Sequence, residues 1–443
     1  MHLGRSLVAA LLLIACLLLA GACIFGGDDD DEVPFPSLTP FPDALIVPLH
    51  EIRDRVAQIR GLPINATAGE GSISNDTLRG YYGASVNDLT EEEEADLEAF
   101  EVVLKLLGVV EGDIDLKQIF GEEFSNLVAG VYVPEDDNLV LISAADGDFG
   151  VQDKITIAHE YVHSFQDGKY DLEEYEKDFV DGDLEEDGFT QYSETLSCLI
   201  EGDASLADEQ YAEQVFGANW REQVQAESAA DPPLDIDIPE FLVRDFYFNY
   251  GECPEFVRAL YDQGGWAAVD AAYDDPPDTT EQVLHVEKYR GRELANTGPP
   301  VDLTEDLDGW KLLDSSQFGE FDVYNWAATL TANSDAARIA GEGWGSGWVR
   351  SYRDENDPTR AIVQLSLGWD TRNDLQEFVG IFPVMLGALD ARGDVVSEGN
   401  FRWTAPGQTG VLFLDNNLER IEIRVATDAE ALAEATADLP QFD

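Results

Sequence analysis

Apolar residues recur at helical spacing in several long segments of the chain. Residues 44–62 carry isoleucine and valine on one broad face, which predicts an amphipathic helix. Another helix is expected to begin after Thr90, whose hydroxyl can cap the first turn, and to end at Gly108. The same periodicity predicts further helices over 152–166, 192–216, 238–250 and 254–273, the first of them ended by Asp167-Gly168.

Short β-branched runs predict strands between and after these helices. Residues 127–133 and 139–142, joined by a turn over 134–138, predict a hairpin. A loop rich in Pro and Asp covers 274–280, and 296–300 has the composition of a domain boundary. Beyond it the pattern predicts strands over 361–367, 410–414 and 421–425, with helices over 374–389 and 428–437, the last capped by Thr427.

These elements predict an α+β fold in two parts. The first is a mainly helical domain with a small sheet over residues 45–297, and the second is a smaller C-terminal α+β domain over 298–443. A length of 443 residues is enough for two domains, and the 44% hydrophobic content excludes a disordered chain.

The N-terminus has the pattern of an export signal rather than of a folded element. Arg5 precedes an apolar run over 7–19, and small residues then lead to Cys23, which resembles a bacterial lipobox. We expect residues 1–22 to be a lipoprotein signal peptide, Cys23 to be lipidated, and the acidic, Pro-rich stretch 23–44 to be a flexible tether. A lipobox ending at Cys16 and an uncleaved membrane anchor are the alternatives. The expected location is the extracytoplasmic face of the cell membrane.

The net charge is strongly negative. The chain has 90 Asp and Glu against 26 Lys and Arg, a formal charge of −64. Nucleic acid is therefore excluded as a partner, because phosphate contacts need clustered cations. The charge is typical of a solvated surface, and adaptation to a salty habitat is the alternative. In the exported body only Cys198 and Cys253 remain besides Cys23, so these two can form a disulfide or stay as separate buried thiols.

The sequence His159-Glu160-Tyr161-Val162-His163 is the decisive chemical motif. In a helix the two histidines lie one turn apart on one face, so both imidazoles can reach one zinc ion. Glu160 lies beside the first histidine, where its carboxylate can act as general base toward metal-bound water. The alternative is a surface helix with two unligated histidines.

A catalytic zinc needs a third protein ligand. The best candidate is Glu201 in Glu201-Gly202-Asp203-Ala204, where Gly202 allows another backbone to approach closely. Asp203 and Glu194 are the alternative ligands. One zinc ion per chain is expected.

The motif and the Glu201 segment together resemble a known group of proteins. An H-E-x-x-H helix followed by a glutamate on the next helix is the gluzincin arrangement. The segments 158–167 and 201–204, with Thr280-Glu281-Gln282-Val283-Leu284-His285, are similar to a poorly characterised group of bacterial secreted or lipoprotein metallopeptidases. The resemblance spans about residues 45–295.

The resemblance implies zinc held by His159, His163 and Glu201, with Glu160 as base. It also implies a small sheet over the active-site helix, with the predicted hairpin supplying an edge strand along which an extended peptide adds. Thermolysin-like gluzincins have an Asp four residues after the ligand Glu, whereas this chain has Ser205 there. Asp203 or Asp208 would then orient the first histidine.

Two further segments carry candidate chemistry. His285 can stabilise a developing oxyanion, and Tyr289 is the weaker candidate for that role. The acidic segment 171–187 is expected to be a solvated surface, with calcium binding as the alternative.

The sequence thus predicts a membrane-anchored zinc metallopeptidase that acts on peptide or protein substrates. A non-catalytic surface binding or assembly module that retains the metal helix is the competing hypothesis. Hydrolysis of a non-peptide amide is a third.

Overall fold

The computed structural model describes most of the chain after residue 32. The signal peptide, the proposed lipidation site Cys23 and both alternatives for this segment therefore lie outside the described residues. None of the described helices is long and apolar enough to cross a membrane. The described ranges are 33–66, 68–110, 112, 114–142, 149–180, 191–229, 237–295, 302–305, 307–397, 399–415 and 419–439.

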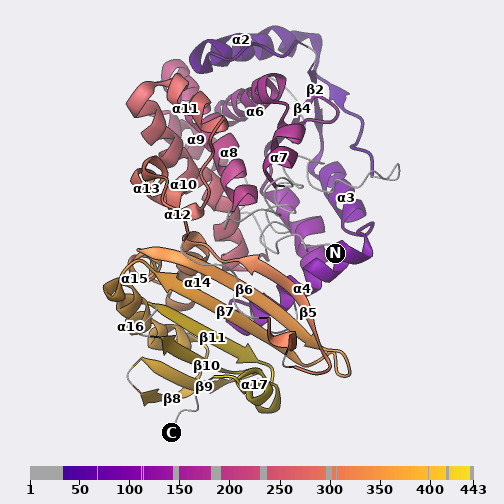
Figure 1. Cartoon of the computed structure of the whole chain (residues 1–443). Helices are drawn as coiled ribbons and strands as arrows, with labels where there is room; N and C mark the ends of the chain where they lie inside the picture. Colours follow the sequence, from indigo (N-terminus) through magenta and orange to yellow (C-terminus); the bar gives the residue numbers. More distant parts are fainter. Residues whose placement is uncertain are drawn as a thin grey trace.

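The chain folds into a helical N-terminal part and a C-terminal part built on a large sheet (Figure 1). This confirms a mixed, mainly helical α+β fold. The N-terminal elements are β1 (Thr39–Pro40), α2 (Asp43–Arg60), β2 (Gly69–Ile73), α3 (Asn75–Ser85), α4 (Glu91–Leu107), α5 (Leu116–Gln118), η1 (Ile119–Glu123), η2 (Phe124–Asn126), β3 (Gly130–Val133), β4 (Asn138–Ile142), α6 (Val151–Tyr170), α7 (Leu172–Val180), α8 (Tyr192–Phe216), α9 (Trp220–Ser228), α10 (Glu240–Gly264), α11 (Trp266–Tyr273), α12 (Thr280–Leu284) and α13 (Val286–Gly291).

The C-terminal part alternates strands and helices after residue 300. Its elements are η3 (Leu303–Glu305), β5 (Trp310–Gln317), α14 (Glu320–Thr331), α15 (Ser334–Gly341), β6 (Trp344–Asp354), β7 (Ala361–Trp369), α16 (Arg372–Ala388), β8 (Arg392–Ser397), β9 (Asn400–Ala405), β10 (Gln408–Asp415), β11 (Arg420–Ala426) and α17 (Ala429–Ala435).

The small N-terminal sheet has the strand order β1-β2-β4-β3. The predicted hairpin is present as β3 and β4, which pair antiparallel with Val131 opposite Val140. Because β3 is an edge strand, its outer side pairs with no other strand of the described chain. All four residues of β3 are buried, and the use of this edge by an extended peptide stays a prediction of the resemblance.

The large C-terminal sheet has the order β5-β6-β7-β11-β10-β9-β8, with antiparallel pairing throughout. Strand β7 alternates strictly: Val363, Leu365 and Leu367 belong to the core on one face, whereas Ile362 belongs to a second cluster on the other. This period of two is what a strand with differently packed faces requires.

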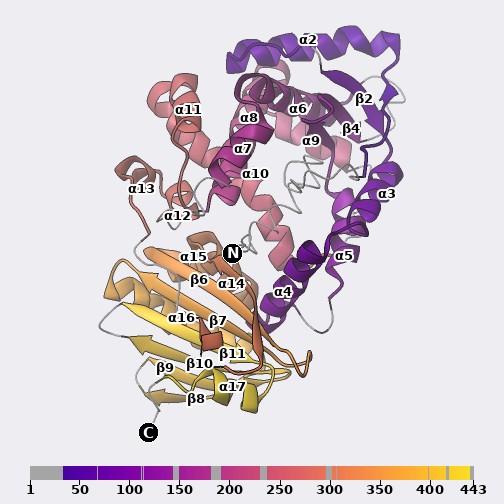
Figure 2. The same ribbon diagram turned by 45° about the vertical axis from the view of Figure 1, so that its right-hand side comes forward.

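The two parts share one hydrophobic core. The cluster that contains the core face of β7 also contains Phe100 and Leu104 of α4. The Trp326 indole nitrogen of α14 donates a hydrogen bond to the Leu107 carbonyl at 3.0 Å. Helix α4 therefore packs on the sheet of the other part, as both ribbon views show (Figure 1, Figure 2). The predicted boundary between residues 297 and 298 falls outside the described residues and stays a prediction.

Several predicted helix ends are confirmed. Thr90 forms a capping box with Glu93, and Gly108 ends α4 in the left-handed conformation with φ of 74°. The predicted helix over 192–216 is α8, with the same bounds.

Three helix boundaries were predicted wrongly. Helix α6 continues through Asp167-Gly168 to Tyr170 and ends at Asp171, whose φ is 56°. Helix α10 continues through Pro254 to Gly264, and the chain breaks instead at Gly265, after which residues 266–273 form the separate helix α11. Helix α17 is capped by Asp428, not by Thr427. In each case tertiary packing or a stronger neighbouring cap overrides a local signal.

The second half of the expected tether is packed against the body. Phe35 contacts the Tyr81 ring edge-on at 5.0 Å between centroids, Phe41 is buried, and β1 pairs with β2. The prediction of a flexible segment up to residue 44 was therefore wrong for residues 33–44. The reason is that apolar side chains between its prolines have a surface to bury against.

Candidate metal centre

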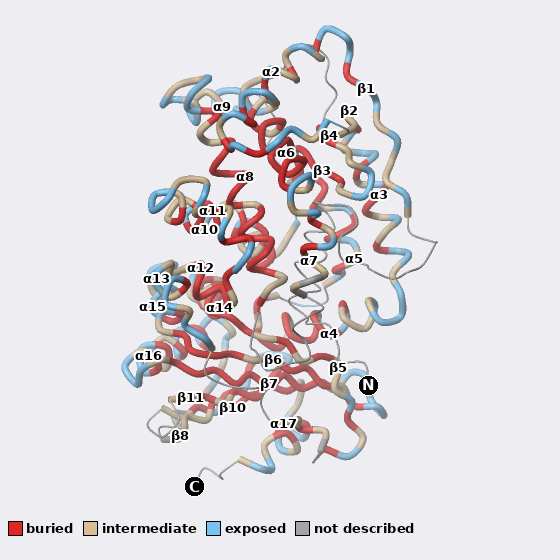
Figure 3. The backbone as a smooth tube through the Cα atoms, turned by 45° about the horizontal axis from the view of Figure 1, so that its top comes forward, coloured by how far each residue is buried: buried red, intermediate tan, exposed pale blue. Residues whose placement is uncertain are grey.

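Helices α6 and α8 lie side by side and carry the predicted ligands. Helix α6 is held in the interior by Ile157, Val162 and Phe165, which have no exposed surface. The tube coloured by burial shows both helices buried along most of their length (Figure 3). The H-E-x-x-H motif is therefore not on a surface helix, which removes the alternative reading of two solvated histidines.

The three predicted ligand atoms converge on one point. The Nε2 atoms of His159 and His163 are 3.0 Å apart. Glu201 Oε2 lies 3.1 Å from Nε2 of His159 and 3.6 Å from Nε2 of His163. A tetrahedral zinc ion with ligand distances of about 2.0–2.1 Å separates its ligand atoms by about 3.3 Å. The spacing of these three atoms matches that requirement.

Hydrogen bonds behind the rings orient both lone pairs inward. Nδ1 of His159 lies 2.8 Å from Oδ2 of Asp208, so this nitrogen donates to the carboxylate. Nδ1 of His163 lies 2.8 Å from Oε1 of Gln166. The Gln166 amide nitrogen donates to the Ile200 carbonyl at 3.0 Å, so its oxygen must accept from His163. With both Nδ1 atoms as donors, each Nε2 presents a lone pair.

Three acceptors facing one another without a donor would repel. Two imidazole lone pairs and a carboxylate oxygen are complemented either by a proton or by a metal ion, and this donor set suits Zn²⁺. The donor set and the spacing of the three ligand atoms together fit a zinc ion. Among the described residues, one other group of three acids lies close enough to hold an ion, Glu281, Glu293 and Asp370, and Lys288 Nζ contacts all three at 2.6 to 2.9 Å.

The same contacts shift the ionisation of the ligands. Burial would raise the pKa of Glu201, but the neighbouring His163 and His159 rings hold it far below its usual value. Burial would lower the pKa of His159, but hydrogen bonds to Asp208 and Glu201 raise it well above the ordinary value. Protons therefore compete with the metal for the histidines.

Glu160 lies between the metal ligands and the edge strand. Its side chain is buried, and burial raises its pKa. A Cβ added at Gly130 of β3 would lie 2.6 Å from Cγ2 of Thr156 and 2.9 Å from Oε1 of Glu160, so this strand passes close to α6 and to the carboxylate. A pocket of about 60 Å³ opens beside Glu160, enough for a few water molecules. It is lined by Gly130, Val131, Tyr132, Pro134, His159, Glu160, His163, Leu172, Glu176, Ser197, Ile200, Glu201 and Tyr250.

The two predicted orienting acids have different places. Asp208 contacts His159 directly, one turn beyond Ser205, and takes the role that the resemblance left open. Asp203 contacts neither histidine. It accepts from Arg60 through both oxygens, at 2.5 and 2.9 Å, and from Gln166 at 3.2 Å, so it supports His163 through Gln166.

The alternative ligands are elsewhere. Glu194 accepts from Gln191 at 2.8 Å and does not line the pocket, and Asp203 is fully occupied by Arg60 and its neighbours. Glu201 is the acid that the fold brings to the histidines.

The structure does not bring His285 to this pocket. Its Nε2 lies 2.9 Å from Oε1 of Glu320, at the start of α14, because the Pro-rich loop before α12 directs the residue toward the C-terminal part. Tyr289 donates to the Asp275 carbonyl at 2.8 Å and also lies outside the pocket. The oxyanion role predicted for either residue is therefore not supported.

Tyr250 is a pocket residue that sequence reasoning missed. It lies on α10, and its ring centroid is 6.2 Å from that of His159. The chain has 15 tyrosines, and nothing local distinguishes this one. Only the packing of α10 against α8 places it opposite the metal ligands.

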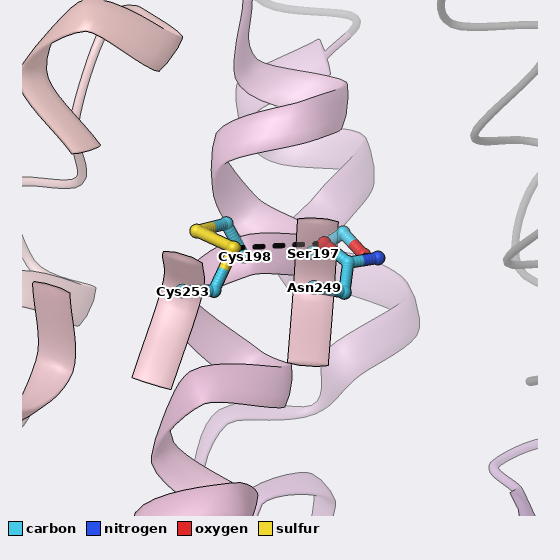
Figure 4. The surroundings of a disulfide bond; sticks show 4 residues. All are labelled: Ser197, Cys198, Asn249 and Cys253. Carbon is cyan, nitrogen blue, oxygen red and sulfur yellow. Dashed lines mark hydrogen bonds between the residues drawn. A yellow bond between two sulfur atoms is a disulfide. The ribbon is translucent and has the colours of Figure 1, made fainter. Parts of the chain in front are cut away.

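The predicted disulfide between Cys198 and Cys253 is present and joins these two helices (Figure 4). One turn beyond Cys198 lies Glu201, and one turn before Cys253 lies Tyr250. A Cβ at Gly202 would lie 2.6 Å from the Cys253 carbonyl, which confirms that this glycine permits close backbone approach. Asn249 also donates to Ser197 at 3.1 Å.

The acidic segment predicted over 171–187 is a helix where it is described. Helix α7 buries Leu172 and Tyr175, and its Leu172 and Glu176 line the metal pocket. Asp171 and Glu174 are exposed, as a solvated acidic face requires, and residues 181–190 lie outside the described residues.

Comparisons of the chain with models of known families, with curated proteins and with solved structures find no match.

Proposed function

We propose that this protein is a zinc-dependent metallopeptidase. The observation that carries the proposal is the convergence of two imidazole lone pairs and a carboxylate, 3.0 to 3.6 Å apart, beside a buried glutamate. Zinc, when bound there, lowers the pKa of water and polarises a carbonyl oxygen. His159, His163 and Glu201 hold the metal in this proposal.

The chain's own residues supply the proton transfer. Glu160 is buried and lines the metal pocket, where its carboxylate would accept a proton from water and later return it to a leaving amine. Strand β3 is the last strand of its sheet and lies beside Glu160, so an extended peptide that paired with its outer edge would place a carbonyl in the pocket. This edge favours a peptide over other amides.

Tyr250 replaces His285 as the proposed oxyanion donor. Its ring lines the pocket, and its centroid lies 6.2 Å from that of the His159 ring. Tyr250→Phe should lower kcat by about 10²-fold with little change in KM. His285→Gln is the control and should leave both constants unchanged, because His285 is bound to Glu320 outside the pocket.

The central test uses metal content and hydrolysis in the same preparations. Purified full-length protein should contain one zinc per chain by elemental analysis. Glu160→Gln should keep that zinc and lose peptide hydrolysis by at least about 10²-fold. Glu201→Gln should lose zinc. Glu174→Gln, on the exposed side of α7, should change neither.

The same experiment separates an enzyme from a binding or assembly module. A protein that holds zinc but cleaves no member of a diverse peptide library would be a binding module. A protein without zinc at His159 and His163 would contradict both readings.

We further propose that the body is anchored by lipid at Cys23 on the extracytoplasmic face of the membrane. The disulfide between Cys198 and Cys253 supports export, because such bonds persist in oxidising compartments. Labelled fatty acid should be incorporated into the wild-type protein and not into Cys23→Ala. Incorporation that persists in Cys23→Ala would contradict this site.

A further inference from the structure

The metal pocket contains a carboxylate that the proposed chemistry does not use. Glu176 of α7 lines the pocket with Tyr132 and Glu201. Among the residues that the structure describes, none forms a hydrogen bond or ion pair with its side chain. Burial, with the charges of Glu135 and Glu201, raises the pKa of Glu176 to about 8. Among the described residues, the Glu176 carboxylate therefore has no cationic partner.

The approach to the pocket is also acidic. A second hollow of about 310 Å³ shares Pro134 with the metal pocket. Asp167, Asp171 and Glu173 line it. Lys169 is its one basic lining residue, and its Nζ is bound to Asp270 at 3.0 Å. The described groups of acids that could hold a metal ion do not include Glu176.

We propose that Glu176 determines specificity by selecting peptides with a positively charged nitrogen next to the scissile bond. This inference rests on the proposed peptidase function. The nitrogen belongs to a Lys or Arg side chain or to a free α-amino group, and both present the same charge and hydrogen-bond donors to the carboxylate.

The selection follows from the cost of leaving Glu176 unpaired. A neutral substrate excludes water from the pocket and gives the carboxylate no partner, whereas a cationic group restores its charge and its hydrogen bonds. The acidic hollow beside Pro134 attracts the same substrates over a longer range.

The test compares two matched peptides on the zinc-loaded full-length protein. Cleavage sites are first mapped in a diverse N-acetylated peptide library. One cleaved peptide is then made with Lys or with norleucine at the position flanking the scissile bond, since norleucine keeps the chain length without the charge. The wild-type protein should prefer the Lys peptide by at least about tenfold in kcat/KM. Unblocked peptides test the α-amino group as the source of the charge.

Glu176→Gln should bring the Lys-to-norleucine ratio close to one. Glu174→Gln is the matched control on the same helix and should keep the wild-type ratio, because this side chain is exposed. A ratio near one in the wild-type protein, or a wild-type ratio that survives Glu176→Gln, overturns the inference while the peptidase function stands. Failure to cleave any peptide overturns both.

Discussion

Helix α6 and strand β7 are both buried, but for different reasons. Strand β7 is enclosed because alternate apolar side chains pack on one face, and Leu365 and Leu367 have no exposed surface. Helix α6 is buried around most of its circumference, and His159, Glu160 and Gln166 lie in its interior-facing turns. Burying polar groups is costly unless each has a partner. The comparison teaches that burial in β7 serves stability, whereas burial in α6 is used to orient chemistry.

The largest expected loss of stability comes from a substitution that breaks the polar network behind α6. Asp203→Ala would leave Arg60 without its main partner, and both side chains are fully buried. Removing one member of such a pair costs about 3–5 kcal/mol. Denaturant unfolding of the zinc-free protein measures the loss.

Asp270→Ala is the matched control for this network. Asp270 also binds Arg60, but it is 36% exposed, so its loss should cost about 1 kcal/mol or less. Equal losses of stability in the two variants would show that the contribution of each acid to stability does not depend on how deeply it is buried.

The next largest loss of stability is expected from a substitution in β7, and it should not change zinc binding. Leu365→Ala removes a fully buried side chain from the shared core and should cost about 3 kcal/mol. The zinc content of the folded protein should not change, because the hydrophobic cluster that contains Leu365 includes no residue of α6. Leu294→Ala, at a residue 67% exposed, should change stability by less than about 0.5 kcal/mol. Zinc loss in folded Leu365→Ala would show that the two regions are coupled.

A smaller effect isolates orientation from stability. Asp208→Asn keeps the shape of the side chain but weakens the hydrogen bond that orients His159. Zinc affinity should fall by about 10–100-fold, measured by competition with a chelator. Ser205→Ala, at the position where thermolysin-like enzymes place an acid, should leave the affinity unchanged. If Ser205→Ala lost zinc affinity and Asp208→Asn did not, Asp208 would not be the residue that orients His159.

The proximity of His159 to His163 could be predicted from the sequence because helical geometry places residues four apart on one face. Glu201 was the best of three candidate ligands, and the small number of cysteines left a disulfide open beside two separate thiols. The hairpin and the cap at Thr90 were also local signals. The histidine pair, the hairpin and the cap each depend on residues close together in the sequence. The cysteine pair depends on the small number of cysteines in the chain.

The rest depends on contacts between distant segments. Gln166 orients His163 only because α8 supplies the Ile200 carbonyl. Tyr250 and Glu176 reach the pocket only through the packing of α10 and α7. His285 was placed wrongly because a rare residue near a resembling motif suggests chemistry, whereas the fold pairs it with Glu320. No periodicity encodes such pairings.

The smallest expected effect is a pH dependence at the junction of the two parts. Burial raises the pKa of Asp322 to about 8 and that of Asp245 to about 7, and it raises the pKa of Glu194 well above its usual value. In the unfolded chain these acids titrate near pH 4. The folded state therefore holds protons that the unfolded state releases, so stability is greatest on the acidic side and falls as pH rises toward 8. Each retained proton contributes a slope of at most about 1.4 kcal/mol per pH unit.

Asp322→Asn tests whether this slope comes from the junction. The amide oxygen can still accept from the Gly319 backbone nitrogen, as Oδ2 of Asp322 does at 2.7 Å, so the cap on α14 is kept. The variant should lose less stability than the wild type between pH 5 and 8 in denaturant unfolding at constant salt. Constant salt matters because the net charge of −64 adds a general repulsion that also grows with pH. If both proteins lose stability in parallel, Asp322 does not contribute to the slope, and the general repulsion or the other two acids cause it.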